Sequence, residues 1–332
     1  MRFLNALLAC LFWATTLFAD CSYPTTFDSY PKDRKAALYA RTAKTSYPEG
    51  LLWQVEKNGH VSYILGTMHI ADARHAPILD AVAPLLDQVD AVFLELSKEA
   101  ESDFLRYLTA NPDLYLIQQG PSLMERLGPE TWAALQPQLK EAGLPEFMAA
   151  RFQPWFLGLS LAIPPCVTAQ QKAGKLGLDR QLEARALPRD LPIRSLDVPA
   201  DLVSLMGGTP LDEQVRDFRD SLAYGALSHD IFGDITEFYF NEETAMIWEF
   251  SKQVVHDQAG PAHKDRIDAL FAEMGKGLVT ERNRLWIDTL APALSDAPAV
   301  VAVGAMHLPG QDGVLSLLAE QGFAVSRVPL TH

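Results

Sequence analysis

Tyr63-Ile64-Leu65-Gly66-Thr67-Met68-His69 is an apolar run that ends in the motif Gly-x-x-His. Near the other end of the chain, Val300-Val301-Ala302-Val303-Gly304-Ala305-Met306-His307 repeats this form, again with methionine directly before the histidine. Short apolar runs rich in β-branched residues predict buried strands, and α/β proteins bind ligands where such strands end. One Gly-x-x-His motif occurs often by chance, but two in matching strand contexts indicate a common site for His69 and His307.

Each motif opens a similar unit of structure. After His69, apolar residues at helical spacing predict a helix over residues 77–88, and residues 91–94 predict a buried strand that Glu95 follows. After His307, the same reasoning predicts a helix over residues 314–320 and a strand over residues 323–328. We therefore expect an α/β fold with a central β-sheet built from two pseudo-repeated strand–Gly-x-x-His–helix–strand units. The last strand of the first unit ends in Glu95, whereas the last strand of the second unit has Arg327 at the corresponding position.

The remaining segments add a hairpin and a large helical insertion. Residues 51–56 alternate as a half-buried strand does, Lys57-Asn58-Gly59-His60 predicts a turn, and residues 61–65 return as the second strand. Between about residues 100 and 290 the chain is mainly helical, with a short strand over 193–197. We expect helices over residues 104–108, 132–140, 147–163, 178–186, 211–227, 231–255 and 269–290. No linker divides the chain, so residues 20–332 are expected to form a single domain.

The first 19 residues predict a signal peptide for export. Arg2 is the only charge before Asp20, and the apolar stretch between them is short for a bilayer-spanning helix. Cleavage after Ala19 is expected, giving a periplasmic or secreted protein. An uncleaved anchor and a lipoprotein attached through Cys21 are the alternatives.

Cysteine usage agrees with export. Removal of the signal leaves Cys21 and Cys166, and a pair in an oxidising compartment most simply forms one disulfide. Two buried free thiols are the alternative.

The charge of the chain argues against two classes of partner. It has 42 acidic and 28 basic residues and a formal net charge of −14. Such a surface repels nucleic acid and anionic membranes. We therefore expect no nucleic-acid partner, and no membrane span after signal removal.

His69, Glu95 and His307 form a candidate metal site. Glu95 ends an otherwise apolar run, and a carboxylate buried there must be paired or must coordinate a cation. If its strand pairs in parallel with the strand before His69, both side chains emerge at one edge of the sheet. Two histidines and a glutamate are ligands that catalytic zinc uses, and Mn²⁺ or Co²⁺ also accept them. The alternatives are that Glu95 is a general base, or that it pairs with an arginine such as Arg327.

Two further residues are candidates for catalysis. Asp179 opens a predicted helix, so it either caps that helix or acts as a general base. Arg282 lies within a predicted helix, where it either stabilises a developing oxyanion or forms a salt bridge.

Several of these motifs together resemble the TraB/GumN family, which includes the Tiki metalloproteases. They are the two Gly-x-x-His segments, Phe93-Leu94-Glu95, Gln153-Pro154-Trp155, Gly177-Leu178-Asp179 and Glu281-Arg282-Asn283, within a resemblance that covers about Gly50 to Val328. The chain is most similar to the bacterial GumN-like branch. One departure is Leu196-Asp197, where the family often has Leu-Glu, which puts a role of that shorter acid at the site in doubt.

The resemblance implies a core related to erythromycin esterase-like proteins, a metal held by the two histidines and the glutamate, and metal-dependent peptide hydrolysis. From the residues and the resemblance we expect an exported metal-dependent hydrolase that acts on a peptide or small-molecule substrate. Two alternatives are a non-catalytic binding protein that sequesters a peptide or glycan, and a protein for metal or haem acquisition.

Overall fold

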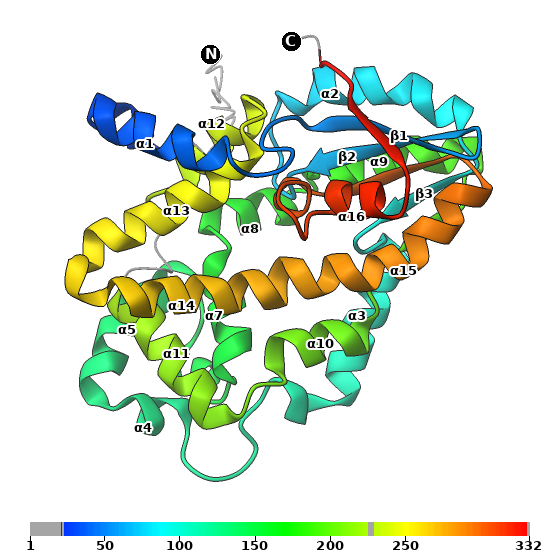
Figure 1. Ribbon diagram of the computed structural model, residues 1–332. Helices are drawn as coiled ribbons and strands as arrows, with labels where there is room; N and C mark the ends of the chain where they lie inside the picture. Colours follow the sequence, from blue (N-terminus) through cyan, green and yellow to red (C-terminus); the bar gives the residue numbers. More distant parts are fainter. Residues whose placement is uncertain (1–20, 22, 225–228, 331–332) are drawn as a thin grey trace, which may run out of the picture.

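A mixed β-sheet forms the centre of the computed structural model, which describes residue 21, residues 23–224 and residues 229–330 (Figure 1). Within these residues the sheet has six strands in the order β4-β3-β5-β2-β1-β6. Their bounds are β1 Leu52–Lys57, β2 His60–Thr67, β3 Ala91–Leu94, β4 Ile193–Ser195, β5 Ala299–Gly304 and β6 Ala324–Arg327. The expected α/β fold with a helical insertion is confirmed.

The predicted hairpin is β1 and β2, paired antiparallel with Lys57 opposite His60. Asn58 and Gly59 join them with φ values of 54° and 83°. Positive φ at both central residues is typical of the two-residue hairpin turn whose twist matches that of the flanking strands. Asparagine and glycine adopt positive φ more readily than other residues, which explains the Asn-Gly sequence.

The two Gly-x-x-His segments end adjacent parallel strands. β2 pairs with β5, and Thr67 lies opposite Gly304. The direct pairing considered between the Glu95 strand and the strand before His69 does not occur, because β3 pairs with β5 and β5 lies between them. The carboxyl ends of all three strands still meet at one edge, since the three run parallel.

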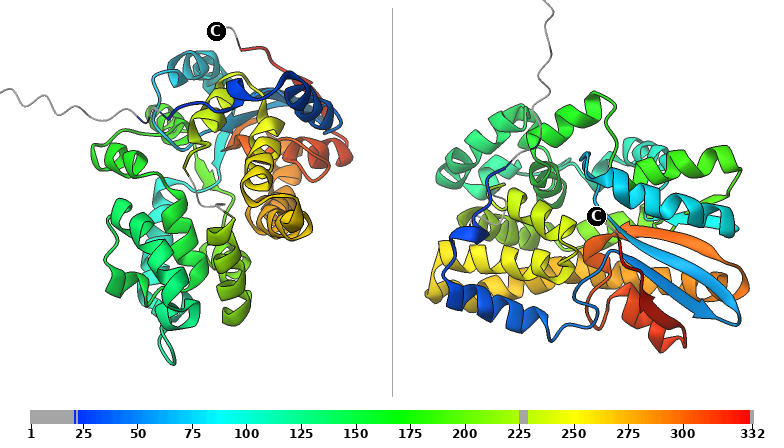
Figure 2. Two further views of the ribbon diagram at one scale, coloured as in Figure 1. Left: turned by 90° about the vertical axis from the view of Figure 1, so that its left-hand side faces the viewer. Right: turned by 90° about the horizontal axis from the view of Figure 1, so that it is seen from above.

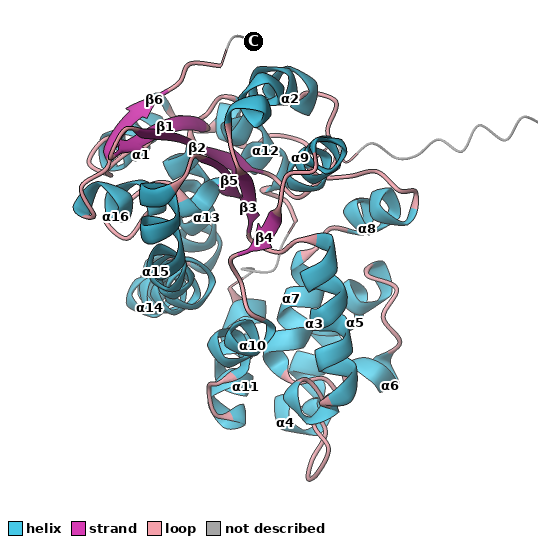
Figure 3. Ribbon diagram, turned by 90° about the vertical axis from the view of Figure 1, so that its right-hand side faces the viewer, coloured by secondary structure: helices cyan, strands magenta, loops and turns pink. Residues whose placement is uncertain are grey.

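Helices cover both faces of the sheet. Alternate side chains of each parallel strand point to opposite faces, and both sets are apolar, so each face must be shielded from water. One set, including Val92, Val300 and Ala302, packs in a core with α2 (His75–Val82), α9 (Leu178–Ala186), α12 (Phe232–Phe240) and α13 (Thr244–Ala259). The other, including Phe93 and Val301, packs against α15 (Glu281–Asp296) and α16 (Val314–Glu320). Figure 3 shows α2 and α9 on one side of the strands and α15 and α16 on the other.

Most of the insertion forms a helical lobe beside the carboxyl edge of the sheet (Figures 1 and 2). Its helices are α3 Lys98–Ala110, α4 Leu123–Leu127, α5 Pro129–Glu141, α6 Glu146–Ala149, α7 Pro154–Ala162, α10 Pro199–Gly207 and α11 Leu211–Ala223. They enclose a separate apolar core that includes Trp132, Leu157 and Phe218. Helix α8 (Pro165–Lys172) leads from the lobe back to α9.

Several predicted helices have other boundaries, among them the one over 269–290, which covers parts of α14 (Lys264–Gly275), η6 (Lys276–Thr280) and α15. The expected helix over 147–163 is two helices, α6 and α7, because the chain between them pairs Phe152 with Leu116 in an isolated bridge. The expected helix over 231–255 is broken between α12 and α13, where Glu242 has φ of 62°. The predicted helix over 77–88 is α2 followed by the 3₁₀ segment η2 (Ala83–Gln88).

A long helical run crosses beneath the sheet, visible in orange in Figure 1. It consists of α14 (Lys264–Gly275), one π-helical segment η6 (Lys276–Thr280) and α15. π-helical turns inside α-helices occur often at functional sites. Here η6 ends two residues before Arg282.

An N-terminal arm, defined here as residue 21 and residues 23–30, is tied to the body. The predicted disulfide between Cys21 and Cys166 is confirmed, with a Cα–Cα distance of 5.4 Å. Asp234 accepts hydrogen bonds from the backbone N–H groups of Thr26 and Phe27. The arm continues into α1 (Lys32–Thr42).

The predicted signal peptide lies outside the described residues. No helix in the described part of the chain is long and apolar enough to cross a membrane.

Candidate functional site

His69 and His307 present the same ring nitrogen to the site. The Nδ1 of His69 lies 3.2 Å from Asp179 Oδ1, and the Nδ1 of His307 lies 2.6 Å from Asn283 Oδ1. Carboxylate and amide oxygens accept, so Nδ1 donates in both rings and Nε2 is the atom left to face inward. Oriented imidazoles of this kind, with Nδ1 bound to an oxygen, are typical of metal-ligating histidines.

Glu95 faces both Nε2 atoms with one carboxylate oxygen. Its Oε1 lies 3.9 Å from His69 Nε2 and 3.7 Å from His307 Nε2. The same oxygen accepts a hydrogen bond from the backbone N–H of Gly304. Burial raises the pKa of this carboxyl, but the positive charges of Arg282 and His69 and the hydrogen bond from Gly304 N–H outweigh that effect and hold it well below its usual range. Glu95 is therefore ionised.

Gly304 leaves the space in which these side chains meet. A Cβ at this position would lie 3.0 Å from Glu95 Oε1, 3.5 Å from His307 Cδ2 and 3.7 Å from His69 Nε2. A side chain at this position would crowd Glu95 Oε1, whereas its contacts with the two histidines would be ordinary van der Waals ones, so glycine leaves room mainly beside Glu95. The structure brings together all three residues that the sequence predicted.

The two histidines differ in exposure and protonation. The His69 side chain is 57% exposed and that of His307 is 6% exposed, so the site opens to solvent on the His69 side. Burial lowers the pKa of His307 to about 3, and this ring is neutral. For His69 burial also lowers the pKa, but the hydrogen bond to Asp179 and the charge of Glu95 together raise it to about 9.

Arg282 joins Glu95 to a second buried carboxylate, Asp197. Its Nη2 lies 2.5 Å from Glu95 Oε2 and 2.5 Å from Asp197 Oδ2. Its Nη1 lies 3.3 Å from His307 Nε2, and its guanidinium stacks over the Trp286 ring at 4.7 Å. The salt bridge expected as one role of Arg282 is confirmed. Arg282, and not Arg327, is the arginine that pairs with Glu95.

Arg327 instead lies on the far edge strand, where it pairs with Glu242 and Glu49. Asp197 does not reach the histidines. Its shorter side chain binds Arg282 and accepts a hydrogen bond from Trp286 Nε1 at 2.8 Å, so it positions the arginine.

Asp179 belongs to the site because the start of α9 packs on the chain around His69. The Leu178 N–H donates to Met68 O at 3.0 Å, and a Cβ on Gly177 would lie 2.4 Å from the carbonyl of His69. Gly177 is the N-cap residue of α9, and no side chain caps the helix. The capping role considered for Asp179 is therefore wrong, and its carboxylate faces His69.

Asn283 and Trp286 are site residues that sequence reasoning did not assign. Asn283 is fully buried, and its Nδ2 donates to the carbonyls of His307 and Asp312. Trp286 stacks on the His307 ring at 4.5 Å. Both project from α15 beside Arg282. They are three residues apart, so a helix places them on the same face, and this spacing was the signal that could have assigned them to the site.

The three donors suit a small divalent cation in type, whereas the two distances from Glu95 Oε1 to the histidine Nε2 atoms are too long for one as they stand. No group of three or more His, Cys, Asp or Glu in the described part of the chain is set to hold a metal ion as it stands. Two ligands bound tetrahedrally at about 2.0–2.1 Å lie about 3.3 Å apart, against 3.7 and 3.9 Å here. If each histidine Nε2 moved about half an ångström closer to Glu95 Oε1, these distances would match the spacing of tetrahedral ligands. Arg282 Nη1 would then have to move away from His307 Nε2.

Comparison with known families agrees with the motifs. The sequence pattern of the TraB/PrgY/gumN family matches residues 51–327, which include every strand of the sheet and all the site residues described above. No curated protein matches the chain. The chain belongs to the TraB/PrgY/gumN family.

Proposed function

We propose that this protein is an exported metal-dependent hydrolase that cleaves amide or ester bonds. One observation carries the proposal: two histidines, each anchored through Nδ1, direct Nε2 at the same oxygen of an ionised glutamate. His69, Glu95 and His307 would hold a divalent cation, namely Zn²⁺, Mn²⁺ or Co²⁺. When bound, such an ion lowers the pKa of a water molecule and polarises the substrate carbonyl.

The surrounding residues have supporting roles. Asp179 and Asn283 fix the two imidazole rings, since their oxygens accept from Nδ1. Glu95 is suited to be a ligand rather than a general base, because its depressed pKa makes it a weak proton acceptor. Arg282 places a fixed positive charge beside this group, where it stabilises negative charge that develops on the substrate.

The substrate reaches the site from the His69 side, which is the exposed one. The resemblance to Tiki metalloproteases favours a peptide as substrate. The Cys21–Cys166 disulfide supports an oxidising compartment, as the predicted signal peptide does.

The test uses a peptide library digested by purified protein and read by mass spectrometry. We expect cleavage that a chelator abolishes and a divalent ion restores. His69→Ala and His307→Ala should abolish it, whereas His60→Ala, at the other end of β2, should not. Glu95→Gln should lose both metal and turnover. A folded, metal-loaded protein that cleaves nothing but retains a peptide or glycan would instead identify a binding protein.

A further inference from the structure

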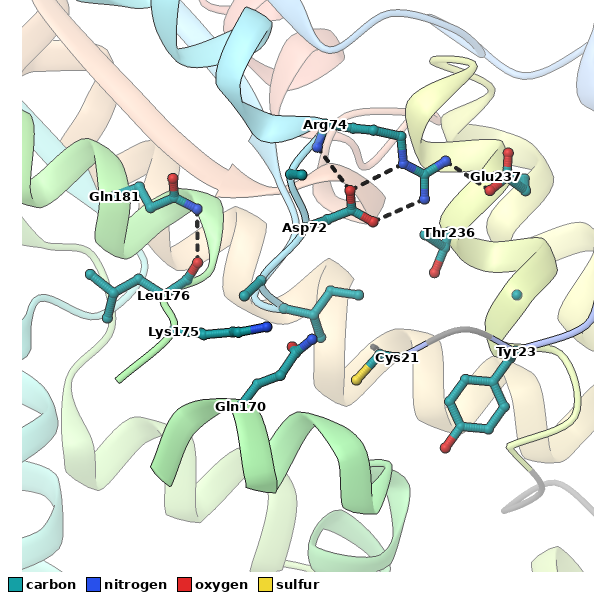
Figure 4. Close-up of a pocket in the computed structure, with 14 residues that line it drawn as sticks. Cys21, Tyr23, Asp72, Arg74, Gln170, Lys175, Leu176, Gln181, Thr236 and Glu237 are labelled. Carbon is teal, nitrogen blue, oxygen red and sulfur yellow. Dashed lines mark hydrogen bonds and ion pairs between the residues drawn. The ribbon is translucent and has the colours of Figure 1, made fainter. Parts of the chain in front are cut away.

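A cleft of about 720 Å³ lies outside the metal site. The segment Ile70 to Arg74, which follows His69 in the chain, forms one wall (Figure 4). The volume is within the range of clefts that bind small molecules and peptide segments. None of the residues that line it belongs to the metal site described above.

Gln181 of α9 also lines the cleft, and three more segments complete it. They are the end of α8 with the loop after it (Gln170, Lys175, Leu176), the side of α12 (Gly233, Thr236, Glu237), and the N-terminal arm (Cys21, Tyr23). The disulfide to Cys166 fixes the arm against α8. On α12, a Cβ at Gly233 would lie 2.4 Å from Tyr23 O, so glycine lets the arm lie directly on the helix.

Gln170 is the unusual residue of this cleft. It is 4% exposed, and its Oε1 has no hydrogen-bond partner among the described residues. A buried, unpaired amide oxygen is unfavourable for the folded protein and needs a reason. Figure 4 shows the side chain pointing away from α8 into the space that the lining residues surround.

The charges in the cleft balance. Arg74 binds Asp72 and Glu237 at 2.9 and 2.8 Å, and with Lys175 the lining holds two acids and two bases. The whole chain carries −14. A cleft without net charge suits neutral polar groups, and Leu176, 44% exposed, adds apolar surface beside them.

We propose that this cleft binds an extended peptide segment, and that the primary amide of Gln170 pairs with one of its peptide groups. A primary amide offers a donor and an acceptor, which match the C=O and N–H of a peptide bond. A peptide is favoured over a glycan because Tyr23, the aromatic residue in the lining, packs its ring edge-to-face on Phe232 at 5.2 Å. The inference rests on the proposed function, since it places the substrate chain next to His69.

The experiment measures binding in the absence of turnover. Acetyl-tetraalanine N-methylamide is titrated into wild-type protein labelled with ¹⁵N at glutamine side chains, with a chelator present. The Gln170 amide signal, assigned from its loss in Gln170→Leu and Gln170→Met, should shift on titration. Gln170→Leu should weaken the affinity about tenfold, the effect of one to two hydrogen bonds.

Gln138 provides a matched control, because its Oε1 is also buried without a partner but it lies on α5, outside the cleft. Gln138→Leu should bind the peptide as the wild type does. The thermal midpoint of Gln170→Leu should equal or exceed that of the wild type, since the change removes an unpaired acceptor.

Four outcomes would overturn the inference: no peptide binding, binding without a shift of the Gln170 signal, equal affinity in Gln170→Leu, or a shift with triacetylchitotriose but not with the peptide. Failure of the hydrolase proposal is distinct. Peptide binding through Gln170 in a protein that never cleaves would leave the cleft assigned and reject the enzyme. Cleavage with an unchanged KM in Gln170→Leu would keep the enzyme and reject the cleft.

Discussion

Replacing Arg282 by methionine should destabilise the protein by about 3–5 kcal/mol, the cost of breaking a buried ion pair from one side. The Arg282 side chain is 13% exposed and lies between two carboxylates, Glu95 and Asp197, that are 12% and 5% exposed. Without the arginine, each carboxylate keeps one other donor, the N–H of Gly304 or of Trp286, and stays buried. Methionine retains much of the apolar stem, so the measurement reports mainly on charge.

The assay is urea unfolding in the presence of a chelator, with Arg284→Met as the control. Arg284 lies on the same helix and also has two ion pairs, to Glu281 and Asp312, but it is 56% exposed. Its replacement should cost less than about 1 kcal/mol. Asp197→Asn combined with Arg282→Met should recover part of the loss. If Arg282→Met costs no more than Arg284→Met, the buried charge network described here is wrong.

Three further changes test other parts of the structure. Gly304→Ala should lower hydrolysis without unfolding the protein, because the added Cβ would lie 3.0 Å from Glu95 Oε1. Gly158→Ala in α7 is the control and should be neutral or stabilising, because its added Cβ would lie 3.7 Å from the Phe218 ring of α11; activity and thermal unfolding measure both changes. Cys166→Ser should lower stability by roughly 5 kcal/mol in the chain-entropy model, and titration of denatured, non-reduced wild-type protein should detect no free thiol from Cys21 and Cys166. Asp257→Asn should destabilise at pH 7, and this effect should shrink as pH falls below the usual carboxyl pKa of about 3.9, as urea titrations at several pH values measure. Hydrogen bonds outweigh burial and hold the pKa of Asp257 below its usual value, so the stability that it contributes is lost as pH falls through the lowered pKa.

The strands and the three site residues were predictable from the sequence because local patterns specify them. β3 and β5 are buried on both faces and are therefore continuous apolar runs. The positive φ values at Asn58-Gly59 restrict the residues that can form the turn. His69, Glu95 and His307 each follow such a strand, and parallel strands bring their carboxyl ends to one edge.

Strand order and pairing partners were not predictable, because they depend on contacts between distant segments. Nothing in the apolar runs indicates that β5 inserts between β2 and β3. The chain has 28 basic residues, and only the packing of α15 against the sheet selects Arg282 for Glu95. The role of Asp179 depends equally on the approach of Gly177 to the backbone of His69.

Metal analysis of the purified protein tests the central claim most directly. Protein purified without chelator, dialysed and measured by mass spectrometry should contain about one divalent ion per chain, and His307→Ala and Glu95→Gln should each contain almost none while remaining folded by circular dichroism. His60→Ala should keep the full amount. Absence of metal from wild-type protein even after incubation with Zn²⁺, Mn²⁺ and Co²⁺, or equal metal in the wild type and the two site variants, would contradict the account.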